Sequence, residues 1–162
     1  MRDEQDLNFV IELYADTIKR ICILYLKNVS DTEDIFQNVF LKYWNSSAHF
    51  ENEEHRKAWF IRVSINECKD LLKLFFRKNV EFIETIGEIS IQTDFDENAY
   101  VREAVMRLPD KYKAVIYLHY FEGYPATTIA KILNKNVNTI YTILARGREM
   151  LRSVLGDNEY ES

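Results

Sequence analysis

Residues 126–155, ATTIAKILNKNVNTIYTILARGREMLRSVL, contain the most informative pattern in the chain. Their apolar residues recur at helical spacing on both sides of a short polar break, which predicts helices over Ala126–Leu133 and Val137–Leu155. Asn134 suits a left-handed turn position, and Asn136 suits the N-cap of the second helix. A short helix, a tight turn and a longer helix are typical of the helix-turn-helix, whose second helix enters the major groove of DNA.

The second of these helices has two different faces. The predicted core face consists of Ile140, Leu144, Gly147, Leu151 and Val154. The opposite face carries Asn138, Tyr141, Thr142, Ala145, Arg146 and Glu149. Amide and guanidinium groups can bind base edges, while Thr and Ala can contact a thymine methyl group. A purely structural helical hairpin would give the same pattern, so at this point both interpretations stay open.

Two further helices are predicted upstream, over Ala99–Arg107 and Lys111–Glu122, separated by Leu108-Pro109. Gly123-Tyr124-Pro125 forms the next turn, with Pro125 at the first turn of the following helix. The apolar face of the longer helix consists of Tyr112, Val115, Ile116, His119 and Tyr120. His119 has no second ligand at metal-binding spacing, which favours a histidine packed on the core.

The first part of the chain is also helical in pattern. An amphipathic helix is predicted over residues 5–27, with Cys22 as a buried thiol on its apolar stripe. Ser30 and Glu33 fit a capping box that opens a second helix, which runs to Asn45. That helix has too many apolar residues for one stripe: Ile35, Phe36, Val39, Phe40, Leu41, Tyr43 and Trp44. Some are expected to face outward as a partner surface, burial on two sides being the alternative.

A polar loop, Ser46–Glu54, precedes a third helix, His55–Lys78. Its predicted buried stripe is Ala58, Ile61, Ile65, Cys68, Leu72 and Phe75. A second stripe, about 120° away at ~100° per residue, consists of Trp59, Arg62, Asn66, Lys69, Lys73 and Arg77. Aromatic rings stack on unpaired bases and cations hold phosphates, so this stripe suits single-stranded nucleic acid. A solvated basic face is the alternative.

The net charge of −5 over 162 residues is unevenly distributed. Residues 81–98 carry six acidic and no basic side chains, whereas residues 55–78 have a net charge of +5 and residues 99–162 of +2. Because DNA senses fields within a Debye length of about 10 Å, the acidic total does not exclude a nucleic-acid partner. Residues 79–98 are predicted to be an acidic linker between two helical domains.

Composition excludes several other classes. With 47% apolar residues but only four Gly and two Pro, an all-α fold is expected. No apolar run approaches ~18 residues and the start lacks a signal-peptide pattern, so a cytoplasmic protein without membrane insertion is expected. Cys22 and Cys68 cannot form a zinc site alone. His49, His55 and His119 form no recognisable set, and no phosphate loop or nucleophile motif is present. We therefore expect no enzyme, cofactor or metal.

Three stretches resemble the extracytoplasmic-function (ECF) sigma factors, the small promoter-specificity subunits of bacterial RNA polymerase. LPDKYKAVIYLHYFEGYPATTIAKILNKNVNTIYTILARGREMLR, residues 108–152, resembles their DNA-binding fourth region. DTEDIFQNVFLKYW, residues 31–44, resembles the part of their second region that docks on the polymerase. RKAWFIRVSINECKDLLK, residues 56–73, resembles the helix that melts the −10 element, with Trp59, Arg62, Asn66 and Asp70 at pattern positions.

The resemblance implies two helical domains and a linker: a region 2-like domain over 1–78, the acidic linker over 79–98 and a region 4-like domain over 99–158. It also implies a sigma factor that binds core polymerase through the β′ clamp helices and the β flap and recognises the −35 and −10 elements. An anti-sigma factor is left open as a further partner. A stand-alone helix-turn-helix regulator acting as a dimer is the alternative function.

Three sets of site residues follow from the resemblance and the stripes. Core-polymerase binding is expected of Asp34, Gln37, Asn38, Phe40, Leu41 and Trp44. Binding and melting of the −10 element is expected of Arg56, Lys57, Trp59, Arg62, Asn66, Lys69 and Lys73. Contacts to the −35 element are expected of Thr127, Asn136, Asn138, Thr139, Tyr141, Thr142, Ala145, Arg146 and Arg148.

The recognition helix departs from the family pattern at three positions. Many members have a basic residue where Tyr141 stands, an arginine where Ile143 stands and an alanine where Gly147 stands. We therefore expect readout by Tyr141, Asn138 and Thr142, with Arg146 and Arg148 left for a base edge and phosphate. Gly147 is expected to weaken the helix by up to ~1 kcal/mol relative to alanine.

Overall fold

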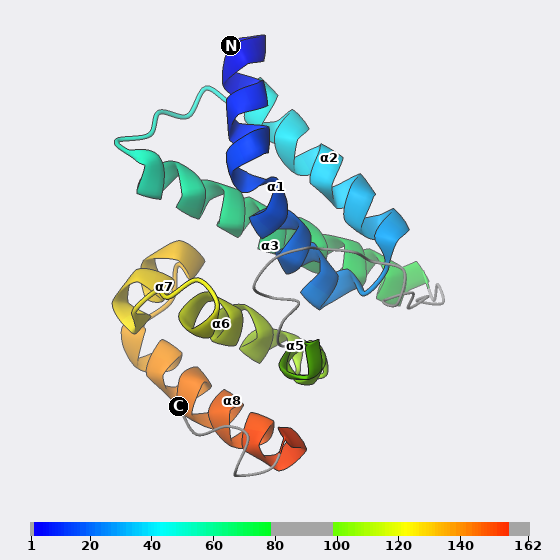
Figure 1. The fold of residues 1–162 in the computed structure, drawn as a ribbon, viewed down its shortest axis with the longest axis vertical. Coiled ribbons are helices and arrows are strands. Elements are labelled where there is room, and N and C mark those ends of the chain that lie inside the picture. Colours follow the sequence, from blue (N-terminus) through cyan, green and yellow to red (C-terminus); the bar gives the residue numbers. More distant parts are fainter. Residues whose placement is uncertain (1, 79–98, 156–162) are drawn as a thin grey trace. The chain divides into compact units, whose positions relative to one another are not determined.

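The computed structural model describes residues 2–78 and 99–155, and every regular element within these ranges is a helix (Figure 1). The predicted all-α fold is therefore confirmed. The described residues fall into two compact units, one on each side of residues 79–98. The predicted linker itself lies outside the described residues.

Three helices form the first unit: α1 (Glu4–Leu26), α2 (Val29–Asn45) and α3 (Glu53–Lys78). Each helix contacts the other two, so the unit is a three-helix bundle. Ile18, Tyr43, Phe60 and Ile61 lie at its centre and are almost fully buried. Cys22 and Cys68 are buried free thiols, as the apolar stripes predicted.

The N-terminus of α2 differs from the sequence prediction. Asn28, not Ser30, is the N-cap: its Oδ1 accepts a hydrogen bond from the Asp31 backbone N–H at 2.8 Å. Its Nδ2 donates to the Leu26 carbonyl at 3.0 Å, which joins the cap to the end of α1. The capping-box prediction was wrong because α1 ends at Lys27 with a left-handed φ of 58°, so α2 starts immediately afterwards. Ser30 then lies inside the first turn.

The second unit contains α5 (Ala99–Met106), α6 (Asp110–Tyr120), α7 (Ala126–Leu133) and α8 (Val137–Leu155). α8 contacts the other three helices. The turn between α7 and α8 is the predicted one: Asn134 adopts φ 54° and ψ 53°, and Asn136 Oδ1 accepts from the Asn138 N–H at 2.8 Å. This turn fixes the direction of α8 relative to α7.

The core face of α8 is wider and shorter than predicted. Ile140, Leu144, Gly147 and Leu151 are buried, but Ile143 is buried as well, which gives the i, i+3, i+4 pattern of a broad apolar stripe. Val154 is 50% exposed, so its assignment to the core was wrong; the buried stripe ends at Leu151.

The face predicted for α6 is also only part of its buried surface. All residues from Tyr112 to Leu118 are buried, because α6 contacts α5, α7 and α8 at once. His119 is half-buried, with Nδ1 2.9 Å from the Tyr124 carbonyl oxygen, as expected of a histidine packed on the core. Tyr120 is 41% exposed, contrary to its assignment to the apolar face.

Candidate polymerase and promoter interfaces

The predicted −35 residues gather on α7, the turn and the outer face of α8. Eight of them are exposed: Thr127, Asn136, Asn138, Thr139, Tyr141, Thr142, Ala145 and Arg146. Tyr141 has 55% of its surface exposed, although it is a large aromatic residue. The Thr142 hydroxyl donates to the Asn138 carbonyl at 3.1 Å, so its hydrogen-bond donor is already satisfied within the helix. The outward face therefore presents a phenol, amides and an exposed arginine.

Arg148 differs from the other members of this set. It is half-buried, and its Nε is a buried atom with no hydrogen-bond partner among residues 2–78 and 99–155. Ile143, the position where the family pattern has an arginine, belongs to the core. Of the two arginines assigned to the −35 element, Arg146 is the one on the exposed face.

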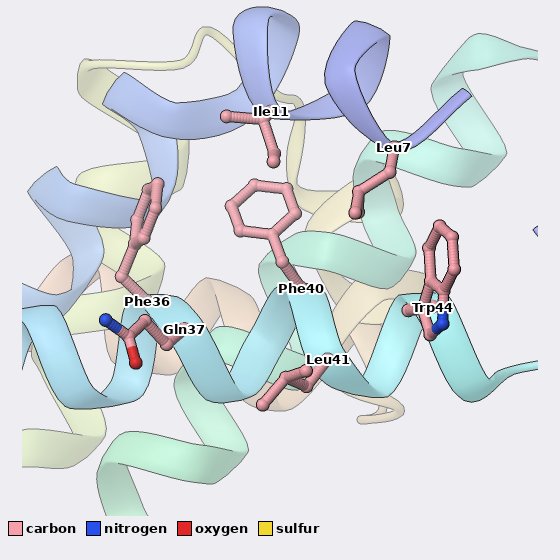
Figure 2. Close-up of a pocket in the computed structure, with 7 residues that line it drawn as sticks. All are labelled: Leu7, Ile11, Phe36, Gln37, Phe40, Leu41 and Trp44. Atoms are coloured by element: carbon pink, nitrogen blue, oxygen red, sulfur yellow. The ribbon is translucent and has the colours of Figure 1, made fainter. Parts of the chain in front are cut away.

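A second surface lies on α2 and faces α1. Leu7 and Ile11 of α1 and Phe36, Phe40 and Trp44 of α2 line an apolar groove of about 430 Å³ (Figure 2). Gln37 and Leu41 also border it, and Leu41 points away from α1 with 56% of its surface exposed. The prediction that part of the apolar set of α2 faces outward is confirmed.

All six predicted polymerase-binding residues lie on α2, and four of them line this groove: Gln37, Phe40, Leu41 and Trp44. Asp34, Gln37, Asn38 and Leu41 are exposed or partly so, and Trp44 is half-buried. Phe40 is buried, with rings of Phe36 and Phe60 at 4.9 and 5.4 Å. Phe40 therefore forms the floor of the groove, whereas the other five side chains are accessible.

The predicted −10 residues form a less uniform set. Asn66 and Lys73 are exposed, while Lys57, Arg62 and Lys69 are half-buried. Trp59 is half-buried in an aromatic cluster, with the rings of Tyr43, Phe50 and Phe60 at 5.8, 6.0 and 5.0 Å. One part of the indole ring is thus packed and the rest is available to a ligand.

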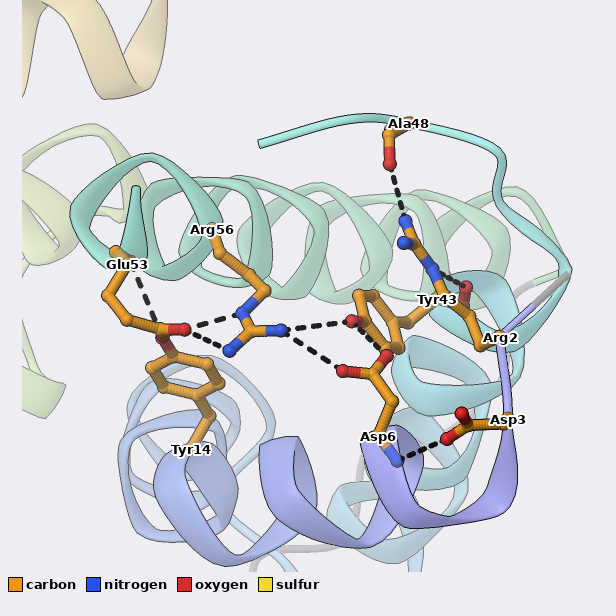
Figure 3. Close-up of polar contacts among 8 residues, drawn as sticks. All are labelled: Arg2, Asp3, Asp6, Tyr14, Tyr43, Ala48, Glu53 and Arg56. Carbon is orange, nitrogen blue, oxygen red and sulfur yellow. Dashed lines mark hydrogen bonds and ion pairs between the residues drawn. The ribbon is translucent and has the colours of Figure 1, made fainter. Parts of the chain in front are cut away.

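Arg56 is placed in a polar network that sequence patterns did not indicate (Figure 3). Its guanidinium binds Asp6 of α1, the Tyr43 hydroxyl of α2 and Glu53 of its own helix. Tyr14 also donates to the Glu53 carboxylate. Glu53 is the i−3 neighbour of Arg56 on α3, but Tyr43, Tyr14 and Asp6 are 13, 42 and 50 positions away, so helical periodicity does not relate these three to Arg56.

Ionisation equilibria reflect this network. Burial, followed by the hydrogen bond to Glu53, raises the pKa of Tyr14 to about 12. Burial, followed by the hydrogen bond to Asp6, also raises the pKa of Tyr43. Burial lowers the pKa of Arg56, but its hydrogen bonds to Tyr43 and Glu53 outweigh this and raise it overall. Both phenols and the guanidinium thus keep their protons throughout the physiological range.

Within residues 2–78 and 99–155, no three His, Cys, Asp or Glu side chains lie close enough together to hold a metal ion. Among the helices of the same ranges, none is long and apolar enough to cross a membrane.

Two family models match the chain in order along the sequence: sigma-70 region 2 over residues 10–78 and sigma-70 region 4 over residues 98–151. The RNA polymerase sigma factor SigV of Bacillus subtilis is 32% identical over 134 residues, covering 82% of this chain and 81% of SigV. The chain belongs to the ECF sigma factors. The ECF sigma factor SigW of the same organism is 29% identical over 171 residues, covering 96% of this sigma factor and 91% of SigW.

Solved structures share the fold. The sigma factor RpoE of Bartonella quintana, crystallised with the anti-sigma factor NepR, superposes with a TM-score of 0.76 at 22% identity, covering 93% of this chain and 97% of RpoE. CnrH in complex with the cytosolic domain of CnrY gives a TM-score of 0.70 at 18% identity, covering 94% and 89%. As an ECF sigma factor, the protein is a promoter-specificity subunit of RNA polymerase. A stand-alone dimeric regulator is not favoured, because residues 10–78 match sigma region 2.

Proposed function

We propose that this sigma factor distributes promoter recognition between its two units. The outer face of α8 binds the −35 element, the Trp59 face of α3 binds the opened −10 strand, and the groove face of α2 docks on core polymerase. The observation that carries the proposal is the exposure of eight of the nine predicted −35 residues on one surface, in a unit that matches sigma region 4.

Recognition of the −35 element follows from the chemistry of α8. Asn136 caps α8, and Asn138 and Tyr141 are exposed in the N-terminal part of this helix. An amide can bind an adenine edge bidentately, and a threonine methyl can contact thymine. Among the predicted −35 residues only Arg146 supplies an exposed positive charge, so we expect affinity to depend on base contacts more than on phosphates.

Strand opening is assigned to the Trp59 stripe of α3 because this stripe combines a partly accessible aromatic ring with amide and basic groups. Stacking of a base on an aromatic side chain contributes roughly 1–3 kcal/mol. Trp59 lies on the same stripe as Arg62 and Asn66, so a base stacked on the indole would have donors beside it. The packed part of the ring, against Tyr43 and Phe50, keeps the exposed part in place.

Docking on the polymerase is assigned to α2 because its groove is apolar with a polar rim. An apolar floor with an accessible Trp is typical of binding hot spots, which become buried in the complex and are surrounded by a polar rim. Docking would place this sigma factor where RNA polymerase acts, in the cytoplasm. By analogy with the RpoE and CnrH complexes, we include an anti-sigma factor of the same cell as a candidate partner.

Transcription with reconstituted holoenzyme tests the proposal. Core polymerase with this protein should give run-off transcripts from promoters selected by the same holoenzyme, and the protein alone should bind those promoters weakly. Trp59→Ala should reduce permanganate reactivity at −10 while closed-complex binding is retained. Tight, polymerase-independent binding to a palindrome, without run-off transcripts from any host promoter, would refute it.

A further inference from the structure

Arg56 connects all three helices of the first unit. Only 14% of its side chain is exposed, and Nη1 donates to Asp6 Oδ1 at 3.2 Å and to the Tyr43 hydroxyl at 3.3 Å. Nη2 donates to the Glu53 carboxylate on the preceding turn of α3. Asp6 belongs to α1 and Tyr43 to α2, so the guanidinium lies between the start of α1, the end of α2 and the start of α3 (Figure 3).

Tyr43 links these polar groups to Trp59. Its hydroxyl donates to Asp6 Oδ2 at 2.6 Å, so both ends of the Asp6 carboxylate are occupied by the network. The Tyr43 ring contacts the Trp59 ring edge-on at 5.8 Å and stacks on Phe50 at 6.3 Å. The position of the indole therefore depends on where the Tyr43 hydroxyl is held.

A second arginine supports the other side of the same ring. The Arg2 guanidinium lies over the Tyr43 ring at 4.4 Å and over the Phe50 ring at 5.4 Å. Its Nη2 donates to the Ala48 carbonyl at 2.6 Å, in the segment between α2 and α3. Arg2 thus fixes the ring plane while Arg56 and Asp6 fix the hydroxyl.

We propose that Arg56 and Asp6 are positioning residues for promoter opening, which hold Tyr43 and through it Trp59, and that Arg56 does not bind a DNA phosphate. This inference rests on the proposed role of Trp59. A phosphate contact would require Arg56 to leave two carboxylates and a phenol, and breaking a largely buried, hydrogen-bonded charge pair is costly. The planar guanidinium can donate to all of these acceptors at once, and a lysine ammonium cannot reproduce that geometry.

The two roles predict opposite effects of Asp6→Asn. If Arg56 bound phosphate, removing the nearby negative charge would leave DNA binding unchanged or improve it. If Arg56 and Asp6 position Tyr43, Asp6→Asn should reduce opening by about tenfold, as expected for one charge-assisted hydrogen bond. Arg56→Met should give a similar loss, and the double variant should lose little more, because both substitutions break the same network.

The test measures permanganate reactivity of −10 thymines with reconstituted holoenzyme over a range of salt concentrations. Asp16→Asn is the matched control, since Asp16 lies on the same helix outside the network. Lys73→Met provides the signature of a lost phosphate contact, a salt slope lower by about one. If Arg56 and Asp6 are positioning residues, Asp6→Asn and Arg56→Met should lower promoter opening and keep the wild-type salt slope. Arg56→Lys should not restore normal promoter opening.

A spectroscopic readout separates positioning from a general loss of stability. The chain has two tryptophans, so ¹⁹F NMR of 5-fluorotryptophan protein gives two signals, assigned with Trp59→Phe. Well below the unfolding transition, Asp6→Asn should shift or broaden the Trp59 signal and leave that of Trp44, which lies at the groove, unchanged. A lower melting temperature with an unmoved Trp59 signal would overturn the proposal in favour of a structural role.

Three results for Arg56 would instead establish a phosphate contact and overturn positioning: a reduced salt slope for Arg56→Met, rescue by Arg56→Lys, and normal opening by Asp6→Asn. Failure of the proposed function itself is distinguishable from these outcomes. In that case the wild-type holoenzyme opens no promoter, while the ¹⁹F signals still report whether Asp6 and Arg56 hold Trp59.

Discussion

Gly147 of α8 lies directly against Ile116 of α6: a Cβ built at Gly147 would come within 2.9 Å of Ile116 Cδ1 and 3.0 Å of Cγ1. Both residues are buried, and Ile116 is fully so. The sequence pattern treats this glycine as a weak point in the helix. The structure shows that the missing side chain lets α8 approach α6 closely.

Gly147→Ala should therefore destabilise the second unit. The gain in helix propensity, up to about 1 kcal/mol, is opposed by an overpacking cost of about 1–3 kcal/mol. We expect a net loss of about 1 kcal/mol of unfolding free energy, measured by urea denaturation. Ile116→Val, which removes Cδ1, should cost less when combined with Gly147→Ala than it does in the wild type. Equal costs in the two backgrounds would show that the two sites do not interact.

Thr142 provides a test of base readout by α8. Its hydroxyl proton is donated to the Asn138 carbonyl, so its methyl group is the part available to a thymine. Thr142→Ser, which removes the methyl group, should weaken −35 binding about fourfold, given ~0.8 kcal/mol per buried methyl-sized group. Thr142→Val, which keeps it, should change affinity by less than about twofold. Competition binding of holoenzyme to a −35 fragment measures both, and the reverse order would assign the contact to the hydroxyl.

Leu41 and Leu13 form a matched pair for the polymerase interface. They are 56% and 47% exposed, on α2 and α1, but only Leu41 borders the groove. Leu41→Ala should weaken core-polymerase binding by about tenfold or more, as truncation of a hot spot does. Leu13→Ala should have little effect, and both should change stability by less than ~0.5 kcal/mol. Similar losses of affinity in the two variants would show that the groove is not the docking surface.

Local patterns predicted most of the fold. The sequence correctly predicted the boundaries of α7 and α8 and the roles of Asn134 and Asn136. Each of these features depends only on residues within about one helical turn along the sequence. The cap of α2 was missed because Ser30 and Asn28 are both good caps. The choice between them depends on where α1 ends, at Lys27.

The site was predicted less completely than the fold, for a physical reason. Amphipathic stripes indicate which residues face outward, and they placed Tyr141, Arg146 and Leu41 correctly on the surface. They do not indicate which long polar side chains fold back onto another helix. Arg56 was predicted to bind DNA from its place on a basic helix, and its contact with Asp6, 50 positions away, could not be predicted from that pattern. Only the packing of three helices brings these groups together.

Because of Tyr14, the first unit should lose stability at alkaline pH. Its hydroxyl donates to the Glu53 carboxylate, and its pKa is raised from the ordinary 10.0 to about 12. The folded state therefore keeps a proton that the unfolded state loses, so this contribution is complete below pH 10 and is lost as the pH rises to about 12. Between pH 10 and about pH 12, the free energy of unfolding of Tyr14→Phe should fall less than that of the wild type. Chemical denaturation at each pH measures both. The difference between their phenolate absorbance titrations should show one tyrosine ionising near pH 12, and a difference centred at pH 10 would contradict the Tyr14–Glu53 contact.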